Sequence, residues 1–304
     1  MRDLVAAAAL CFLGASAAAF PSAAGAADAK QQIARAADGV PIAYDVRGKG
    51  NTAVVLVHCW ACDRSFWRGQ VDALASRHRV VTLDLAGHGA SGDGRARFTV
   101  GGLGGDVQAV VEALKLSRVV LVGHSMGALV ALDAARRMPG RVAGVVAVDA
   151  LHDVEQRVPR ETAEKLAALY EEDFRGTMTT MVQRMLPRDA SPAVVEFVTG
   201  HAAAARPGPP IALLRDYPDV DAAAWMDAAK VPVRAINSGP PVSPVTKIGH
   251  NRRHGDYDVS FLDGTGHYPM LERPAEFNRR LEAAVSEVLA VRPAPASGAR
   301  ASQP

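Results

Sequence analysis

Six short runs rich in valine recur along this chain and constrain its fold more than any other feature. They are apolar on both faces and lie at residues 53–57, 79–84, 118–123, 142–149, 231–237 and 258–263. Helical spacing of apolar residues occurs between or after them, at residues 65–76, 99–116, 126–138 and 274–290. Strands that are apolar on both faces are typical of parallel sheets covered by helices on both sides. The alternation therefore predicts an α/β fold with a doubly wound, mostly parallel sheet.

More local signals refine this prediction. Residues 32–48 predict an antiparallel hairpin that turns at Asp38-Gly39, because this dipeptide is a strong turn signal between two apolar segments. Thr99 and Pro274 are expected to begin two of the helices, as an N-cap residue and as a first-turn proline.

The alternating pattern is interrupted once. Residues 151–230 contain helical patterns and no convincing strand, which we interpret as a helical cap inserted after the sixth strand. The predicted organisation is a first part of the α/β core at 28–150, the cap at 151–230, and a second part of the core at 231–291.

Both ends of the chain differ in composition from the rest. Residues 1–27 combine a basic Arg2 with an apolar stretch and small residues before Ala26 and Ala27, which is typical of a cleaved secretory signal peptide. An uncleaved N-terminal anchor is the alternative. Residues 292–304 are rich in proline, alanine and serine and are expected to be disordered. We therefore expect a periplasmic or secreted protein with no stable membrane span after cleavage.

Charge and cysteine content exclude several classes of protein. The net charge is +2 and there is no basic run, so nucleic acid is not an expected partner. Cys59 and Cys62 are the two cysteines that follow the predicted signal peptide, which is too few for a fold built on disulfides. A hydrophobic core must hold the fold. The oligomeric state stays open.

One motif carries a chemical meaning. The stretch "VVLVGHSMGALVALDAARR" at 119–137 contains Gly-His-Ser-Met-Gly directly after a predicted strand and directly before a predicted helix. This context is that of a nucleophile elbow, in which Ser125 occupies a tight turn and the glycines at 123 and 127 let strand and helix approach. The start of the helix and the amide of Met126 can then stabilise negative charge.

With this motif in place, the chain resembles the α/β-hydrolase family across residues 32–290. Besides "GHSMG", the segments "DLAGHGASG" (84–92) and "GTGHYPMLERPAEF" (264–277) resemble the loop after the fourth strand and the histidine-bearing segment of that family. The chain is most similar to a subgroup with a helical cap and an H-G-x oxyanion loop. The resemblance implies Ser125 as nucleophile, His267 as base, and the amides of Met126 and Trp60 as oxyanion donors.

The acid that should orient the histidine does not follow the most common family pattern. That position follows the penultimate strand, and residues 238–247 contain no carboxylate. Some members place the acid at the end of the sixth strand, so we predict Asp149, with Asp153 as the alternative. The remaining alternatives are that the acid is Asp256, Asp258 or Asp263, or that the site has no acid.

The loop "HCWAC" raises a separate question, because Cys59 stands where the family usually has glycine. A redox C-x-x-C needs a different fold, and a zinc site needs two further ligands, so neither redox nor metal chemistry is expected. A disulfide between Cys59 and Cys62 is a further reading. His58, Cys59 and His124 are candidates for the wall of the substrate pocket.

The expected function is that of a serine hydrolase that cleaves a small or medium apolar carboxylic ester through an acyl-enzyme, without metal or organic cofactor. The alternatives are a perhydrolase or carbon–carbon bond hydrolase, and a non-catalytic ligand-binding member of the family. The apolar residues of the cap are expected mostly to form its own core, with some available to an acyl pocket: Leu166, Leu169, Tyr170, Phe174, Met178, Met181, Met185, Phe197 and Trp225.

Overall fold

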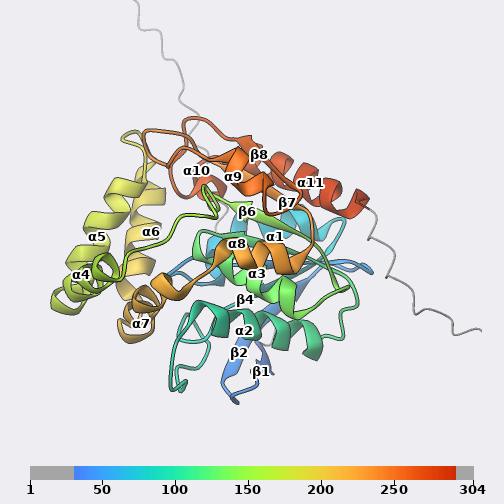
Figure 1. Cartoon of the computed structure of the whole chain (residues 1–304), viewed down its shortest axis with the longest axis horizontal. Coiled ribbons are helices and arrows are strands. Elements are labelled where there is room, and N and C mark those ends of the chain that lie inside the picture. The colour runs from blue at the N-terminus through green and yellow to red at the C-terminus, as the bar shows by residue number, and fades with distance from the viewer. Residues whose placement is uncertain (1–30, 292–304) are drawn as a thin grey trace, which may run out of the picture. The chain divides into compact units, whose positions relative to one another are not determined.

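A computed structural model describes residues 31–291 of the chain. The predicted signal peptide and the predicted disordered tail lie outside the described residues. The described chain contains an eight-stranded sheet in the order β1-β2-β4-β3-β5-β6-β7-β8 (Figure 1). The strands are β1 (Gln32–Arg35), β2 (Pro41–Arg47), β3 (Ala53–Val57), β4 (Arg79–Leu83), β5 (Val119–His124), β6 (Val142–Val148), β7 (Val233–Asn237) and β8 (Tyr257–Phe261).

The predicted strand directions are confirmed. β1 and β2 form the antiparallel hairpin, β2 pairs antiparallel with β4, and every pairing from β4 to β8 is parallel. All five residues of β3 are buried. Val55 and Val57 belong to the hydrophobic core on one face of the sheet, whereas Val54 and Leu56 belong to the core on the other. This burial on both faces explains why the run is apolar without alternation.

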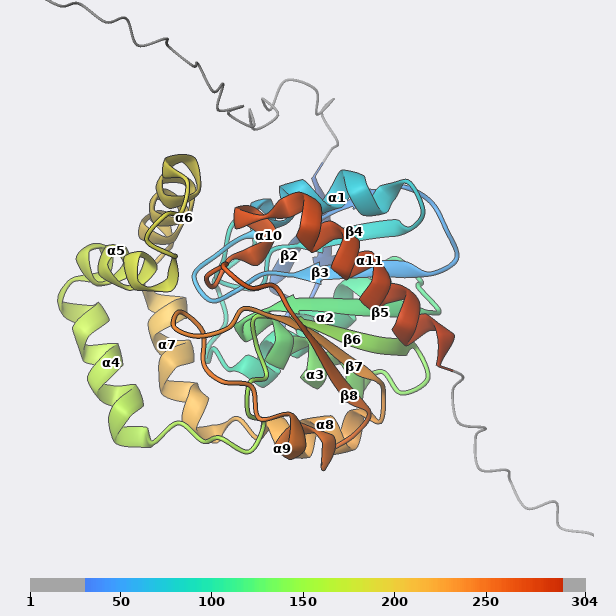
Figure 2. The ribbon, with the colours of Figure 1, turned by 90° about the horizontal axis from the view of Figure 1, so that it is seen from above.

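Helices cover both faces of the sheet (Figure 2). On one face α2 (Val100–Ala113) packs against α3 (Met126–Arg137), and α3 contacts β5 and β6. On the other face α1 (Arg68–Ala75) and α11 (Pro274–Ala290) lie together over the strands. Thr99 accepts a hydrogen bond from the amide of Gly102 at 2.9 Å and so caps α2 as predicted. Pro274 begins α11, also as predicted.

The helix predicted at 65–76 has two parts. It begins as a short 3-10 helix, η1 (Arg64–Trp67), and continues as α1. Asp63 accepts a hydrogen bond from the amide of Ser65 at 2.7 Å, which begins the segment one turn before the α-helix.

The insertion after β6 is helical, as predicted, and divides into two groups. Its helices are α4 (Arg160–Glu172), α5 (Phe174–Met185), α6 (Pro192–Ala204), α7 (Gly208–Asp216), η2 (Tyr217–Asp219) and α8 (Ala222–Ala229). α4 packs with α7 and α5 with α6, and these four helices stand beyond the carboxyl ends of the strands (Figure 2). α8 packs instead on α3 and joins the core under the sheet. The range predicted for the cap thus also contains one helix of the core layer.

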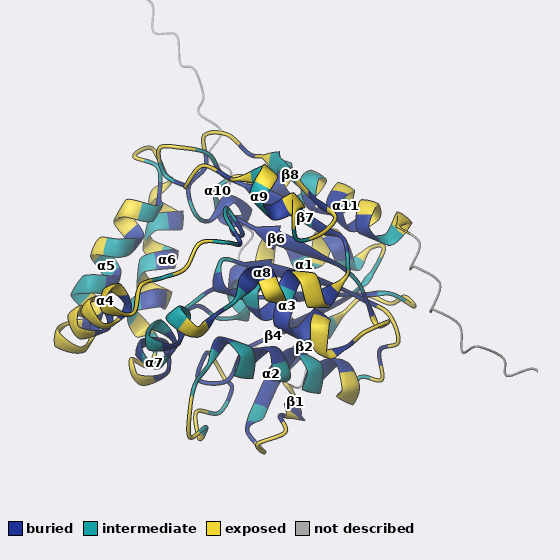
Figure 3. Cartoon of the chain, viewed as in Figure 1, coloured by how far each residue is buried: buried dark blue, intermediate teal, exposed yellow. Residues whose placement is uncertain are grey.

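Burial follows this arrangement. The strands from β3 to β7 are largely buried, whereas the edge strands β1 and β8 are mostly not, and α4 and α5 expose their outer sides (Figure 3). Two further short helices, α9 (Ile248–Arg252) and α10 (Pro269–Glu272), complete the described fold. Within residues 31–291, none of the helices combines the length and apolar character needed to cross a bilayer.

Candidate active site

Ser125 lies in the tight turn that the sequence predicts. It connects β5 to α3 with φ 53° and ψ −119°, a backbone conformation that side-chain-bearing residues rarely adopt. The turn is held by the hydrogen bond from the amide of Ser125 to the carbonyl of Val148 at 3.0 Å. A Cβ at residue 127 would lie 2.5 Å from the carbonyl oxygen of Val57, so only glycine lets α3 approach the end of β3 this closely.

His267 and Asp149 come together from distant parts of the chain. Asp149 follows β6, and His267 lies in the loop between β8 and α10. The His267 Nδ1 donates a hydrogen bond to Asp149 Oδ2 at 2.6 Å, since the ionised carboxylate can only accept. Nδ1 therefore carries the proton and Nε2 is left as the basic nitrogen. Both residues line the same cavity as Ser125.

Asp149 receives further hydrogen bonds from the loop after β7, where the sequence has no carboxylate. The amide of Ser238 donates to Oδ1 at 2.9 Å, and the Ser243 hydroxyl donates to Oδ2 at 2.8 Å. Burial alone would raise the pKa of Asp149, but the hydrogen bonds from His267 and Ser243 and the charges of His267 and His152 lower it overall. The carboxylate is thus kept ionised although it is buried.

Sequence reasoning missed the groups that hold the His267 loop. Glu272 accepts hydrogen bonds from the amides of Gly266 at 2.6 Å and Tyr268 at 2.9 Å, on either side of the histidine. The amide of His267 donates to the carbonyl of Met185 at the end of α5, at 2.8 Å. The position of the histidine therefore depends on the cap as well as on the core. A glutamate five residues after the predicted base was the one available signal.

The segment after β3 passes beside the nucleophile turn. His58 Nδ1 donates to the carbonyl of Cys59 at 2.8 Å, and its Nε2 accepts from the amide of Leu85 at 3.0 Å. Burial is the main reason that the pKa of His58 is lowered to about 4, which keeps the ring neutral. Cys59 and Cys62 form a disulfide.

The sequence predicts two main-chain amides as oxyanion donors: that of Met126, which lines the cavity, and that of Trp60, which does not belong to its lining. Met126 is the first residue of α3, where amides have no partner within the helix. In the part of the chain that the structure describes, the amide of Trp60 donates to no other protein group. The Trp60 side chain is engaged elsewhere, because its Nε1 donates to the carbonyl of Pro210 in α7 at 2.8 Å.

The residues predicted to form the pocket wall lie elsewhere. His58, Cys59 and His124 are buried and do not belong to the lining of the cavity. His124 Nε2 instead donates to the carbonyl of His267 at 2.6 Å, and burial with the neighbouring His267 lowers the pKa of His124 to about 3. The hydrogen bonds of His58 and His124 join the loops around the site to one another.

Asp153, the alternative acid, does not contact His267. It accepts from the amide of Glu155 at 3.0 Å and lies 3.1 Å from His250 Nδ1. The ligand atoms of Asp153, Glu155 and His250 lie within 4.8 Å of one another, which a metal ion could use. However, the guanidinium of Arg253 already donates to both oxygens of Glu155, at 2.9 and 2.7 Å. We interpret the cluster as an ion-pair network.

The cavity that holds Ser125 and His267 measures about 420 Å³. Besides Ser125, Asp149 and His267, its polar residues are His152, Asp153, Gln156, Tyr217 and Ser243. The rest of its lining is apolar and includes no lysine or arginine. Of the cap residues singled out in the sequence, Met185 lines it. Tyr170, Phe174 and Met178 are buried in a core that the cap shares with the sheet, whereas Leu169 is exposed.

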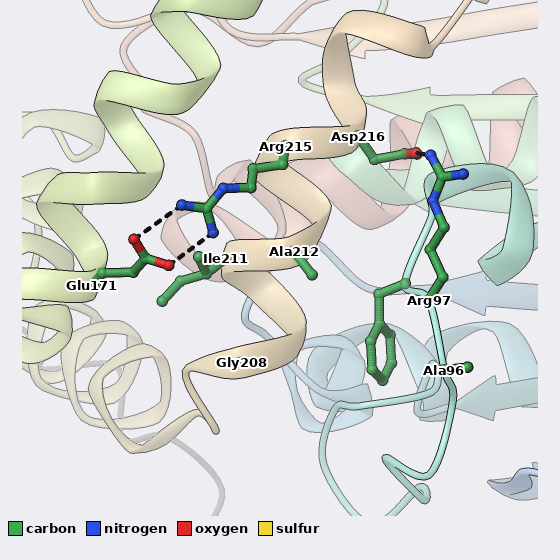
Figure 4. A pocket seen from close by; sticks show the side chains of 9 residues that line it. Ala96, Arg97, Glu171, Gly208, Ile211, Ala212, Arg215 and Asp216 are labelled. Atoms are coloured by element: carbon green, nitrogen blue, oxygen red, sulfur yellow. Dashed lines mark hydrogen bonds and ion pairs between the residues drawn. The ribbon is translucent and has the colours of Figure 1, made fainter.

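A second cavity, of about 370 Å³, lies between α7, α4 and residues 96–98 (Figure 4). Its charged groups are already paired: Arg215 donates to both oxygens of Glu171, and Arg97 lies 3.7 Å from Asp216. It contains no nucleophile placed against a base. The cavity at Ser125 is therefore the candidate active site.

The fold and this site define a class. A mostly parallel sheet with a serine in a strained turn after β5, and a histidine bonded to a carboxylate after β6, is the architecture of an α/β hydrolase. The sequence profile described as "Alpha/beta hydrolase family" matches residues 54–280. The chain belongs to this family.

Solved structures with the same fold include two whose names describe hydrolases. One is a thermophilic esterase from Thermogutta terrifontis, with a TM-score of 0.75, 22% identity, and coverage of 86% of this chain and 99% of that one. The other is an enol-lactonase from Burkholderia xenovorans LB400, with a TM-score of 0.74, 22% identity, and coverage of 84% and 100%. At 22% identity, the similarity to these structures shows only that the fold is shared.

The curated relatives match over shorter segments. The dihydrolipoyllysine-residue acetyltransferase component of an acetoin cleaving system from Pseudomonas putida is 38% identical over 102 residues, which is 34% of this chain and 28% of that protein. The 3-oxoadipate enol-lactonase 1 from Acinetobacter baylyi is 38% identical over 95 residues, which is 31% of this chain and 35% of that protein. The matched segments thus span only about a third of these relatives.

Proposed function

We propose that this chain is a serine hydrolase that cleaves a small or medium apolar carboxylic ester through an acyl-enzyme. The observation that carries the proposal is the hydrogen bond of 2.6 Å between His267 Nδ1 and Asp149, in the cavity that also holds Ser125. This bond leaves Nε2 as the base for a hydroxyl that shares the cavity. The names of the similar esterase and enol-lactonases agree with ester or lactone bonds as the substrate class.

We infer the following reaction for these groups. His267 Nε2 takes the proton of the Ser125 hydroxyl as its oxygen attacks the acyl carbon. The amides of Met126 and Trp60 donate to the oxyanion that forms. His267 then gives its proton to the departing alcohol, and water attacks the acyl-enzyme with His267 again as base. Asp149 keeps the histidine in the required tautomer and stabilises its positive form.

The properties of the cavity favour an uncharged acyl group. A volume of about 420 Å³ lies within the usual range for small-molecule pockets. Because its lining contains no lysine or arginine, a carboxylate on the acyl group would have no cationic partner. We also propose export to the periplasm or the medium, which is consistent with the Cys59–Cys62 disulfide because disulfides persist in oxidising compartments.

The test begins with a fluorophosphonate probe on the purified protein. We expect one adduct per chain, on Ser125, and none on the variant Ser125→Ala. A series of p-nitrophenyl esters should then be hydrolysed fastest at short or medium acyl chains. The lack of any adduct on the native protein would refute the proposal. Labelling without ester hydrolysis, but with turnover of a dienoate or formation of a peracid, would support the alternative chemistries instead.

A further inference from the structure

The Cys59–Cys62 disulfide closes a four-residue turn in the loop proposed to bind the oxyanion. The two cysteines are three residues apart, and their Cα atoms are 5.3 Å apart. The amide of Cys62 donates to the carbonyl of Cys59 at 3.2 Å, so the main chain also closes the turn. Trp60 is the first of the two central residues, and Ala61 is the second. Both sulfur atoms belong to buried residues.

The sequence of this turn does not favour its own conformation. Ala61 has φ 54°, in the left-handed region, which glycine adopts freely and alanine adopts only at a cost. A turn of this kind usually has glycine at its second central position. Without a covalent link, Ala61 would shift the turn toward other conformations, and the direction of the Trp60 amide would change with it.

The side chain of Trp60 is held as well, by contacts with two helices of the cap. Its indole donates to Pro210 of α7, and its ring meets Tyr170 of α4 edge to face, with 5.0 Å between the ring centres. The residue is therefore held by the cap through its side chain and by the disulfide through its main chain. The carbonyl of Cys59 is held in turn by His58. The oxyanion loop is thus constrained covalently by the disulfide and non-covalently by the packing of the Trp60 side chain against the cap.

We propose that the Cys59–Cys62 disulfide is a positioning element for the oxyanion hole, which holds the Trp60 amide in the direction needed for turnover. The inference rests on the proposed function, since it assigns a role to the loop of that same site. It also assigns a role to the cysteine that stands where the family usually has glycine. The covalent link holds a turn whose second central residue, Ala61, does not favour the conformation it adopts.

The proposal makes turnover dependent on the redox state of this pair. A dithiol reductant breaks the S–S bond by transferring two electrons and two protons, which leaves two thiols on the protein and converts the dithiol to its own disulfide. The reduced turn is then free to relax at Ala61. Removal of the reductant and oxidation by a disulfide such as oxidised glutathione reverses the exchange and should restore turnover.

The main experiment compares the native protein with the double variant Cys59→Ala/Cys62→Ala. We expect kcat for the preferred p-nitrophenyl ester to fall about 10- to 100-fold with KM little changed, because outright loss of an oxyanion donor costs about 100- to 1000-fold. Affinity for a trifluoromethyl ketone inhibitor, which forms an oxyanion with Ser125, should fall in parallel with kcat. Reduction of the native protein with dithiothreitol should have the same effect.

A third substitution separates positioning from a general loss of structure. In the double variant, Ala61→Gly should recover about fivefold in kcat, because glycine accepts the left-handed conformation without the tether. The same substitution in the native protein is the matched comparison, and any gain in kcat there should be smaller than the recovery in the double variant, since the disulfide already holds the turn. Thermal unfolding of each variant shows whether it is folded at the assay temperature.

The outcomes are distinct. A double variant with native kcat and native inhibitor affinity would overturn the inference and leave the proposed function intact. A loss of kcat that Ala61→Gly does not recover, with KM rising in proportion, would also overturn it, because the disulfide would then be a general structural brace. A native protein without a Ser125 adduct would overturn the proposed function and the inference with it.

Discussion

Replacement of Asp149 by asparagine is the most direct test of the site. Asparagine has the same shape, but one of its two terminal atoms is an amide nitrogen. The amide of Ser238 needs an acceptor and is expected to keep the asparagine oxygen, since it donates to Oδ1 in the native protein. The new NH₂ group then faces His267 Nδ1, which must accept. The proton moves to Nε2, so the nitrogen that should act as base toward Ser125 is a donor instead.

The expected loss follows from this change of tautomer. In a triad of this kind, replacement of the acid by its amide lowers kcat by about 10⁴-fold, which corresponds to about 5.4 kcal/mol of transition-state stabilisation. The protein should remain folded, because both Ser238 and Ser243 can still pair with the asparagine. The Ser243 hydroxyl only has to rotate and accept from the NH₂ group.

The assay is steady-state hydrolysis of the preferred p-nitrophenyl ester, together with the rate of Ser125 modification by the fluorophosphonate. Both rates should fall in Asp149→Asn, and circular dichroism should match that of the native protein. Asp153→Asn is the matched control, since Asp153 pairs with His250 and not with His267. Retention of more than about a tenth of native kcat in Asp149→Asn would refute the reasoning. A large loss of kcat in Asp153→Asn, without one in Asp149→Asn, would also refute it.

Two further predictions concern stability. Burial lowers the pKa of His88 to about 3, so below pH 6.5 the unfolded chain binds a proton that the folded chain refuses, and the unfolding free energy falls with falling pH. Between pH 7 and 4.5, the free energy of unfolding should therefore fall by about 2 kcal/mol less in His88→Asn than in the native protein. Urea titrations at the two pH values measure this difference, and equal decreases in the two proteins would contradict the prediction. Gly127→Ala should lower the free energy of unfolding by about 1–3 kcal/mol, because the added Cβ would lie too close to main-chain carbonyls. Gly105→Ala is the control in open space on α2 and should be neutral or stabilising by up to about 1 kcal/mol, so equal effects at the two positions would refute the argument.

Much of the fold could be predicted because its signals are local. The valine-rich runs mark strands buried on both faces, and the observed strands agree with them to within about two residues. The placement of α8 could not be predicted, because its helical pattern resembles those of the cap helices. Its position on α3 depends on which apolar surface it covers, and this is decided only when distant segments meet.

The same distinction applies to the site. Ser125 and His267 occur in short motifs whose residues are neighbours in sequence. The hydrogen bond from His267 to Asp149 spans 118 residues, and the two serines that pair with Asp149 lie in a loop that the sequence marked only by its lack of a carboxylate. The sequence also placed His58, Cys59 and His124 at the pocket wall. His58 and His124 are buried against residues of other segments, Leu85 and His267, and no local pattern reveals these contacts.

By itself, the sequence determined the order of strands and helices, the turn that presents Ser125, and the site of the helical insertion, since each depends on residue spacing and on local backbone preference. The tertiary structure decided which carboxylate meets His267 and that Met185 of the cap holds the histidine loop. It also closed the Cys59–Cys62 pair around Trp60. The first two share a physical reason, whereas the disulfide joins residues only three apart in the sequence. Contacts between segments far apart in the chain form only when the sheet brings the carboxyl ends of its strands to one edge.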